Sequence, residues 1–419
     1  MTSGTQRATC YGLFAVAVWV LIGGAPRPAY AQGYPPAEGG SPAQAESDSF
    51  GYDALKVLVG GSVAHDSNLF RVSDVSASPQ SETIGTAYVG LRFDKPYAQQ
   101  RFQLGATVTE YHYDRFSYLN FTALDYRAAW LWHLTPRVSG SLRANRTETP
   151  TQFQDQVGFQ PNVRTTESYG VDVDGLIAGG WHILAGLDHA SSKGENTVVQ
   201  NQPNYRQNSV DAGVKYLFRS GSHIAVLARR NEGDQDDRFQ NNVVVPSTDD
   251  YAQDDTEVRG TWLINAKSTL TGRVTYLDRR YDQAPLRNYS GTAGAIGYDW
   301  RPTSKVNLRF SATRDIAPWQ SSTSAYRTSN TFSLKPTWQA TAKISVSAGL
   351  LRRYDDYPSA VAGVPDRKDT TDYAALSAEW TPLRSLSISA SVFRLVRSSN
   401  DPLGEYSTTV SKIGAALTF

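Results

Sequence analysis

The chain has 419 residues with 41 basic and 40 acidic side chains, so it has neither the basic surplus nor the basic cluster of a nucleic-acid-binding protein. It contains a single cysteine, Cys10, which excludes a disulfide framework within the chain. After the first 31 residues no apolar stretch approaches the roughly 20 residues that a membrane-spanning helix requires. Aromatic residues nevertheless make up 11% of the chain, with 23 Tyr and 9 Trp.

The first 31 residues have the pattern of a secretory signal peptide. Arg7 precedes an apolar run over 11–24, and Ala29-Tyr30-Ala31 follows as a small-x-small cleavage site. We therefore predict cleavage after Ala31, and a lipid anchor is not expected because Cys10 precedes the apolar run. Removing 1–31, which holds Arg7, Arg27 and no acid, leaves 39 basic and 40 acidic residues. Residues 32–50, rich in Pro, Gly, Ala and Ser, are predicted to form a flexible periplasmic lead-in.

From residue 51 to 419 apolar and polar residues alternate, which is the period of a β-strand. In 385–392, SLSISASV, apolar side chains alternate with serine. We predict an all-β domain over 51–419, a transmembrane antiparallel outer-membrane β-barrel. The expected strands, in chain order, cover 54–66, 82–93, 100–113, 119–132, 137–147, 164–178, 182–192, 206–218, 222–232, 250–264, 267–279, 288–300, 305–316, 326–338, 342–354, 369–380, 385–397 and 406–419.

Short and long connections alternate along this domain. Eight short turns follow an aromatic residue, as in WRPTSKVNLRF from Trp300, whereas the other connections are long and hydrophilic, as in 231–255. Outer-membrane barrels have short periplasmic turns and longer extracellular loops. With both termini in the periplasm, eight turns separate nine hairpins, which gives about 18 strands, with 16 as the alternative.

Aromatic residues mark the periplasmic ends of the predicted strands. We assign to an interface girdle the seven tryptophans near the short turns: Trp130, Trp132, Trp181, Trp262, Trp300, Trp338 and Trp380. Tyr111, Tyr113 and Tyr118 suit either an extracellular girdle, which we favour, or a stacking surface in the lumen. The chain ends in IGAALTF, in which Ile413, Leu417 and the terminal Phe419 share one face. This ending resembles the C-terminal signal by which such barrels are recognised by the outer-membrane assembly machinery.

The polar faces of the strands should line the lumen. Four arginines fall on these faces: Arg127, Arg143, Arg273 and Arg309. They would attract anionic solutes or, equally, pair with inward acids such as Asp125. The acidic loop residues lack an EF-hand pattern, and neither a G-x-S-x-G nor an H-E-x-x-H motif occurs. We therefore expect no catalysis, no metal and no cofactor.

Three stretches resemble the EpsL type of outer-membrane barrel, which is encoded with exopolysaccharide biosynthesis genes and belongs to a broader group of β-barrel porins. They are HDSNLFR (65–71), LRFDKPYAQQRFQL (91–104) and FSYLNFTALDYRAAWLWHLTPR (116–137). The resemblance implies a role in exopolysaccharide biosynthesis or export across the outer membrane of a Gram-negative bacterium. The implied partners are outer-membrane lipid, the exopolysaccharide and periplasmic export components. A general or solute-selective porin, and a plugged structural or adhesive barrel, are the alternatives.

Overall fold

The computed structural model describes residues 54–73, 75, 77–150, 153, 159–195, 204–235, 238–240, 243–245, 250–282, 285–319, 324–359 and 363–419. The predicted signal peptide and periplasmic lead-in lie outside these residues. Within these ranges, no helix is long and apolar enough to cross a membrane.

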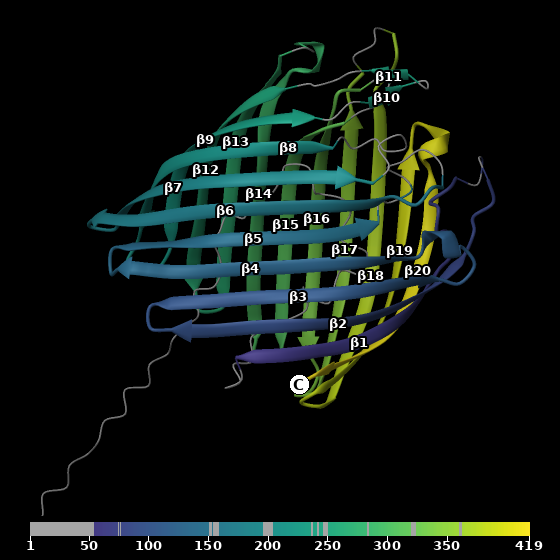
Figure 1. The fold of residues 1–419 in the computed structure, drawn as a ribbon, viewed down its shortest axis with the longest axis horizontal. Helices are drawn as coiled ribbons and strands as arrows, with labels where there is room; N and C mark the ends of the chain where they lie inside the picture. Colours follow the sequence, from purple (N-terminus) through teal and green to yellow (C-terminus); the bar gives the residue numbers. More distant parts are fainter. Residues whose placement is uncertain are drawn as a thin grey trace, which may run out of the picture.

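Eighteen strands form one closed antiparallel sheet (Figure 1). In chain order they are β1 (Leu55–Asp66), β2 (Glu82–Tyr97), β3 (Gln100–Tyr113), β4 (Phe121–Thr135), β5 (Val138–Pro150), β6 (Val163–Ala178), β7 (Trp181–Gly194), β8 (Tyr205–Leu217), β9 (His223–Gln235), β12 (Tyr251–Asn265), β13 (Ser268–Tyr281), β14 (Tyr289–Thr303), β15 (Val306–Pro318), β16 (Tyr326–Gln339), β17 (Ile344–Tyr357), β18 (Arg367–Leu383), β19 (Leu386–Ser399) and β20 (Tyr406–Thr418).

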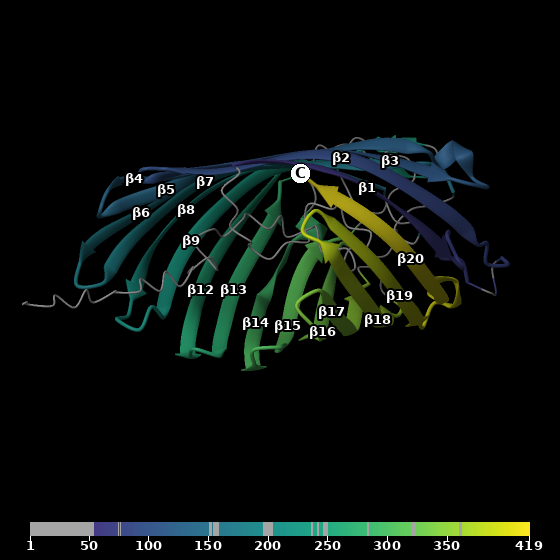
Figure 2. The same cartoon turned by 90° about the horizontal axis from the view of Figure 1, so that it is seen from below.

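Each strand pairs with its neighbour in the chain, and β20 pairs with β1 to close the barrel (Figure 2). The closing register runs from Leu58 opposite Thr418 to Asp66 opposite Val410. At the last residue, the Phe419 backbone nitrogen donates to the Val57 oxygen at 2.9 Å, and the Val57 nitrogen donates back at 3.0 Å. Closure leaves no unpaired sheet edge, as a spanning sheet needs in lipid. The prediction of 18 strands is confirmed, and the alternative of 16 is wrong.

The two faces of each strand differ as the alternation predicts. On β17 the exposed side chains of Ile344 and Leu350 point outward, while Ser345 and Ser347 take the intervening inward positions. Beyond Leu350, the outward position is occupied by Arg352, whose Nε lies 2.6 Å from the Asp372 carboxylate of β18. The outer wall is therefore apolar nearest the short turns and charged toward the long loops.

Most strand ends lie within three residues of the predicted boundaries, and two larger departures have a structural reason. Strand β2 continues four residues beyond the expected end at 93, because Arg101 on β3 forms a two-point ion pair with Asp94 at 2.6 Å and extends the hairpin. The turn between β2 and β3 consists of only Ala98 and Gln99, and Ala98 has a φ of 52°. In addition, the segment expected to be a long loop between β9 and β12 contains a short hairpin, β10 (Arg238–Gln240) with β11 (Val243–Val245).

Inward side chains become more buried toward the long-loop end. On β17 the inward positions from Ser345 to Leu351 are partly exposed, whereas Arg353, Asp355 and Tyr357 are at most 5% exposed. The same gradient holds on β13 and β19. In a barrel of this size, an unfilled lumen would leave the inward side chains exposed to solvent at both ends. Side chains therefore fill much of the lumen at the long-loop end, and the lumen is more open at the short-turn end.

Candidate functional site

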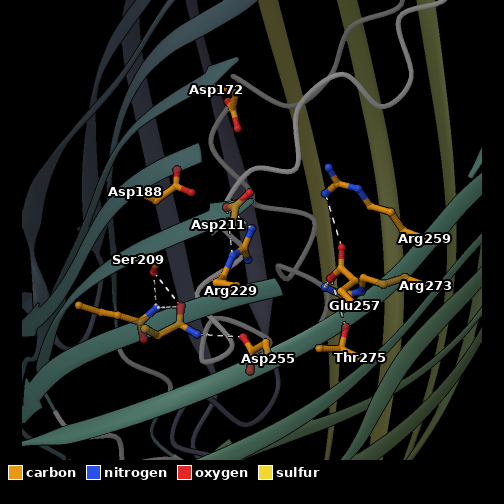
Figure 3. A network of polar contacts seen from close by, with 12 residues as sticks. Asp172, Asp188, Ser209, Asp211, Arg229, Asp255, Glu257, Arg259, Arg273 and Thr275 are labelled. Carbon is orange, nitrogen blue, oxygen red and sulfur yellow. Dashed lines mark hydrogen bonds and ion pairs between the residues drawn. The ribbon is translucent and has the colours of Figure 1, made fainter. Parts of the chain in front are cut away.

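The lumen is the candidate site, and its charged wall lies on strands β5 to β9, β12 and β13. Figure 3 shows acidic and arginine side chains projecting from these strands into the interior. Arg143 on β5 lies 2.5 Å from the Asp172 carboxylate and 3.5 Å from that of Asp188. The hydroxyl of Ser141, the preceding inward residue of β5, donates a hydrogen bond to the Asp172 carboxylate at 2.9 Å. The first part of the wall is thus a group of paired charges on three adjacent strands.

The same pattern continues on β8 to β13 (Figure 3). Arg229 on β9 pairs with Asp211 on β8, with Nη2 3.0 Å from Oδ1. On the next strands, Glu257 lies 3.5 Å from the Arg259 guanidinium and 3.9 Å from that of Arg273. The Thr275 hydroxyl also donates to Glu257 at 3.2 Å. Each charge on this wall has an oppositely charged partner, so no buried charge is left unpaired. Such a wall is suited to contact with hydrated solutes.

Hydroxyl groups line the inner wall on other strands. Three pairs span neighbouring strands: Ser311 with Ser333 at 2.6 Å, Ser347 with Ser377 at 2.7 Å and Ser62 with Thr86 at 2.6 Å. All six are inward positions that alternate with apolar outward ones. A hydroxyl can both donate and accept hydrogen bonds, so this wall can exchange bonds with water or sugar hydroxyls.

At the long-loop end, residues 67–73 form a segment that packs against the inner wall; we call it the inner segment. Its Leu69 and Phe70 are buried against Tyr113 and Leu119, and Tyr113 is an inward residue of β3. Phe70 also packs edge-on against Phe116, with ring centroids 4.8 Å apart. An apolar cluster inside a polar lumen reduces the space available to solute at this end of the barrel.

The carboxylate of Asp66 at the end of β1 holds the inner segment in place. It accepts hydrogen bonds from the Asn68 backbone nitrogen at 2.9 Å, from two Arg71 nitrogens at 2.9 and 2.8 Å, and from the Thr408 hydroxyl of β20 at 2.7 Å. The Asn68 side chain donates to the Val72 and Ser407 carbonyls. Arg71 has a φ of 54°, a strained value for a residue with a side chain. The ion pair with Asp66 helps to hold that conformation.

A second set of buried groups lies on β16 to β19. Trp319, just beyond β15, packs its ring 5.2 Å from Tyr357 and lies beneath the Arg327 guanidinium. Arg353 lies 2.8 Å from Asp355 on the same strand. Together with the inner segment, these groups narrow the lumen from two different parts of the wall.

The geometry shows a closed β-barrel, and the sequence shows the family of the chain. Residues 188–419, more than half of the chain, match the family model described as "Putative beta-barrel porin 2". The chain belongs to this family of β-barrel porins. No curated protein matches this sequence.

Solved outer-membrane proteins share the general fold at low identity. They include the alcaligin receptor FauA of Bordetella pertussis, with 12% identity, 86% of this chain and 76% of the other covered, and a TM-score of 0.43. The ferric enterobactin receptor PfeA of Pseudomonas aeruginosa has 8% identity, coverage of 87% and 81%, and a TM-score of 0.46. OccK2 (OpdF) of Pseudomonas aeruginosa, solved with glucuronate, has 9% identity, coverage of 87% and 97%, and a TM-score of 0.48. At these identities the likeness concerns the barrel fold alone.

All four predicted lumen arginines of the porin lie on inward faces, but at different places. Arg143 and Arg273 belong to the charged wall described above. Arg309 lies nearer the short turns, with its Nε 2.8 Å from Asp299, and Arg127 interacts electrostatically with Asp94 in the same region. Asp125, given above as an example of an inward acid, accepts from the Glu148 backbone nitrogen at 2.9 Å. The four arginines therefore do not form one cluster.

The acids of the charged wall were not singled out from sequence. A signal for them existed, since 171–175, VDVDG, alternates Val with Asp172 and Asp174 and so puts both acids on the polar face. Asp174 is inward as well, with its Oδ1 2.5 Å from the His182 ring, and it also pairs with Lys215. Among the residues that the structure covers, no group of three or more His, Cys, Asp or Glu side chains is placed to hold a metal ion.

Six of the seven predicted girdle tryptophans are exposed outward positions near the short turns: Trp130, Trp181, Trp262, Trp300, Trp338 and Trp380. Trp132 is partly buried and lies over Gly140. Phe218, which sequence analysis did not include, packs between Tyr216 and Trp262. Phe419 is outward and 68% exposed.

Tyr111 and Tyr113 require a correction. We favoured an extracellular girdle for them, but both occupy inward positions of β3. Tyr113 is buried in the cluster of the inner segment, and Tyr111 stacks on Phe121 with ring centroids 4.5 Å apart. The strand alternation decides this, because the outward positions of β3 are those of Leu104 and Val108. Tyr118 lies in the following 3-10 turn and is exposed.

Proposed function

We propose that this porin is a passive channel through which small hydrophilic solutes cross the outer membrane. The observation that carries the proposal is the mid-lumen wall, where paired charges line some strands and hydroxyl groups line others. Such a wall replaces the hydrogen bonds of a solute's hydration shell and gives an apolar solute no favourable surface. An 18-stranded barrel is also wide enough to enclose an aqueous channel.

The packing at the long-loop end supports small solutes as the cargo. The inner segment and Trp319 occupy the lumen from different strands, and the surrounding inward side chains are buried. A polymer chain would have to displace these packed aromatic groups, whereas a small solute needs only a narrow path beside them. This arrangement resembles a constricted pore more than an open conduit.

Exopolysaccharide export is the second candidate, and the resemblance of three stretches to EpsL-type barrels favours it. The structure gives the first stretch, HDSNLFR, a local role, since it contains Asp66, Asn68 and Arg71, which build the inner segment. The hydroxyl-lined strands would offer hydrogen bonds to a sugar chain. In this case the inner segment must move when polymer passes.

Single-channel conductance separates the two candidates. The mature protein, refolded and inserted into a planar bilayer, is measured with and without exopolysaccharide from the same bacterium. For a small-solute channel we expect steady conductance that the polymer leaves unchanged. Conductance blocked by the polymer would favour export. No conductance in repeated insertions would contradict both and indicate a plugged barrel whose loops carry the function.

A further inference from the structure

The outward face of strands β15 to β19 changes from apolar to basic along the barrel. Exposed apolar side chains cover the part nearer the short turns: Phe332, Leu350, Leu376 and Val392. Toward the long loops, three exposed arginines take outward positions: Arg314 on β15, Arg352 on β17 and Arg394 on β19. Arg352 is directly opposite Phe332 in the register of β16 and β17. These three arginines, which we call the arginine row, therefore begin where the apolar surface ends.

The arginine row lies at one level of the barrel. Each member is six residues beyond an outward residue that faces a girdle tryptophan on the paired strand: Leu308 opposite Trp300, Val346 opposite Trp338 and Ile388 opposite Trp380. Six residues of strand span about 20 Å, and the tilt of barrel strands reduces this to about 15 Å of height. A long arginine side chain can carry its charge further, toward the polar headgroups. The guanidinium groups thus lie near the outer boundary of an apolar band that is about 25 Å tall in such barrels.

Two members of the row have no acidic partner among the residues that the structure describes. Arg394 is exposed and makes no hydrogen bond or ion pair within those residues. Arg314 donates to neutral oxygens, the Thr292 carbonyl at 3.2 Å and the Asn330 side chain at 3.0 Å. The loop residues 320–323 and 360–362, which lie outside the described ranges, contain no charged side chain. These two guanidinium groups therefore keep a positive charge that their own and the neighbouring strands do not balance.

Other parts of the outer wall differ in this respect. Outward arginines on the other described strands have acidic partners: Arg146 with Glu148, Arg206 with Asp234, Arg230 with Asp254 and Arg280 with Asp278. Beyond the apolar band, the outward positions of β15 to β19 carry four cations and two acids: Arg314, Arg352, Lys368, Arg394, Asp356 and Asp372. Four minus two leaves an excess of two positive charges on this side of the barrel. An anionic group in the membrane would balance it.

We propose that the arginine row binds phosphate groups of lipids in the outer leaflet of the membrane. A guanidinium presents its donors in a planar fork that matches the oxygens of a phosphate. The apolar side chains below the row, such as Phe332 and Leu350, would contact the acyl chains of the same lipid. A lipid therefore gains contacts at this site that a free phosphate ion lacks. Neither the site nor its test depends on the channel function proposed above.

Titration of the refolded mature protein in detergent with diphosphoryl lipid A, followed by native mass spectrometry, tests the row. Arg314→Gln and Arg394→Gln each remove one unbalanced charge. Each should weaken binding about fivefold, since one basic side chain near an anionic lipid surface contributes about 1 kcal/mol. Arg230→Gln is the matched control, because Arg230 is also outward but already lies 2.8 Å from Asp254 and 3.3 Å from Glu232. It should leave the dissociation constant unchanged.

A second lipid separates recognition of phosphate from contact with acyl chains. Monophosphoryl lipid A keeps the acyl chains and has one phosphate fewer, so it should bind the wild-type protein more weakly. Equal affinity for the two lipids would contradict a phosphate site.

Three further outcomes would overturn the proposal. The first is an equal dissociation constant in wild type and both row variants, with heat-modifiable gel migration showing that the variants fold. The second is equal weakening by Arg230→Gln, which would show that only the overall charge matters. The third is displacement of the lipid by an equimolar amount of inorganic phosphate, which would make the free ion the ligand.

Discussion

At the scale of single residues, Asp66 has the clearest structural role. Its carboxylate joins the end of β1, the inner segment and β20 through four hydrogen bonds, and its side chain is 6% exposed. Its partner Arg71 is 15% exposed and holds a left-handed backbone conformation. Strain of this kind persists only where surrounding contacts determine it. This carboxylate therefore makes a central contribution to the position of the inner segment, beside the hydrogen bonds of Asn68 and the packing of Leu69 and Phe70.

We predict that Asp66→Asn releases the inner segment. Breaking a buried ion pair by removing one partner costs about 3–5 kcal/mol, because the other charge remains buried. The strands of the barrel should stay intact, so single-channel conductance should rise while the β-rich circular dichroism spectrum is unchanged. Asp372→Asn, whose ion pair is exposed on the outer wall, serves as the control and should leave conductance at the wild-type level. Unchanged conductance in Asp66→Asn would show that the inner segment does not limit flow.

At the scale of elements, each strand faces lipid with one side and the lumen with the other. Glycine at an outward position has a specific use where a neighbouring aromatic ring covers the backbone. Trp132 of β4 lies over Gly140 of β5, and a Cβ at Gly140 would be 2.3 Å from Trp132 Cζ2 and 2.2 Å from the Asp172 carbonyl oxygen. A Cβ at Gly272 of β13, in contrast, would meet no heavy atom within 4 Å. Two glycines on the outer wall thus have opposite tolerance for a side chain.

Gly140→Val should destabilise the barrel and Gly272→Val should not. Overpacking of this kind typically costs about 1–3 kcal/mol, whereas a valine in open space on a strand is expected to change stability by less than about 0.5 kcal/mol. The measurement is urea-induced unfolding of the refolded protein in detergent, followed by tryptophan fluorescence. Equal midpoints for the two variants would contradict the packing of Trp132 over Gly140.

At the scale of the whole molecule, the two ends of the barrel are chemically different. Short turns with aromatic girdle residues lie at one end, and the long loops, the inner segment and the buried charges lie at the other. Charged outward residues such as Arg352 also lie toward the long-loop end. Outer-membrane barrels place the short turns in the periplasm. The narrow end of the lumen should therefore face the cell exterior.

Cysteine labelling tests this orientation. Leu403 lies in the loop between β19 and β20 and is 67% exposed, whereas Lys267 lies in the turn between β12 and β13. Leu403→Cys should react with a membrane-impermeant maleimide on intact cells, and Lys267→Cys should react only after the outer membrane is disrupted. The wild-type protein controls for labelling at other sites. Labelling of Lys267→Cys alone on intact cells would reverse the assigned orientation.

The sequence alone determined where the strands lie and which face of each strand is apolar, and it favoured 18 strands while leaving 16 open. These are local properties, because successive side chains of an extended chain point to opposite sides whatever the partner strand is. Thus the inward placement of Arg143 and the outward placement of Trp262 follow from their neighbours in the chain. The same alternation also fixed the sides of Tyr111 and Tyr113, and here our interpretation, rather than the pattern, was wrong.

Only the tertiary structure decided which inward groups meet. Asp172, Asp188 and Asp211 come together because the registers of β6, β7 and β8 align them beside glycines, and register depends on pairing between strands. The inner segment is a clearer case, since Asp66 and Thr408 are 342 positions apart and meet only when β20 closes on β1. The sequence therefore specified a barrel with a polar interior, and closure of the barrel determined where that interior is narrow and where it is charged.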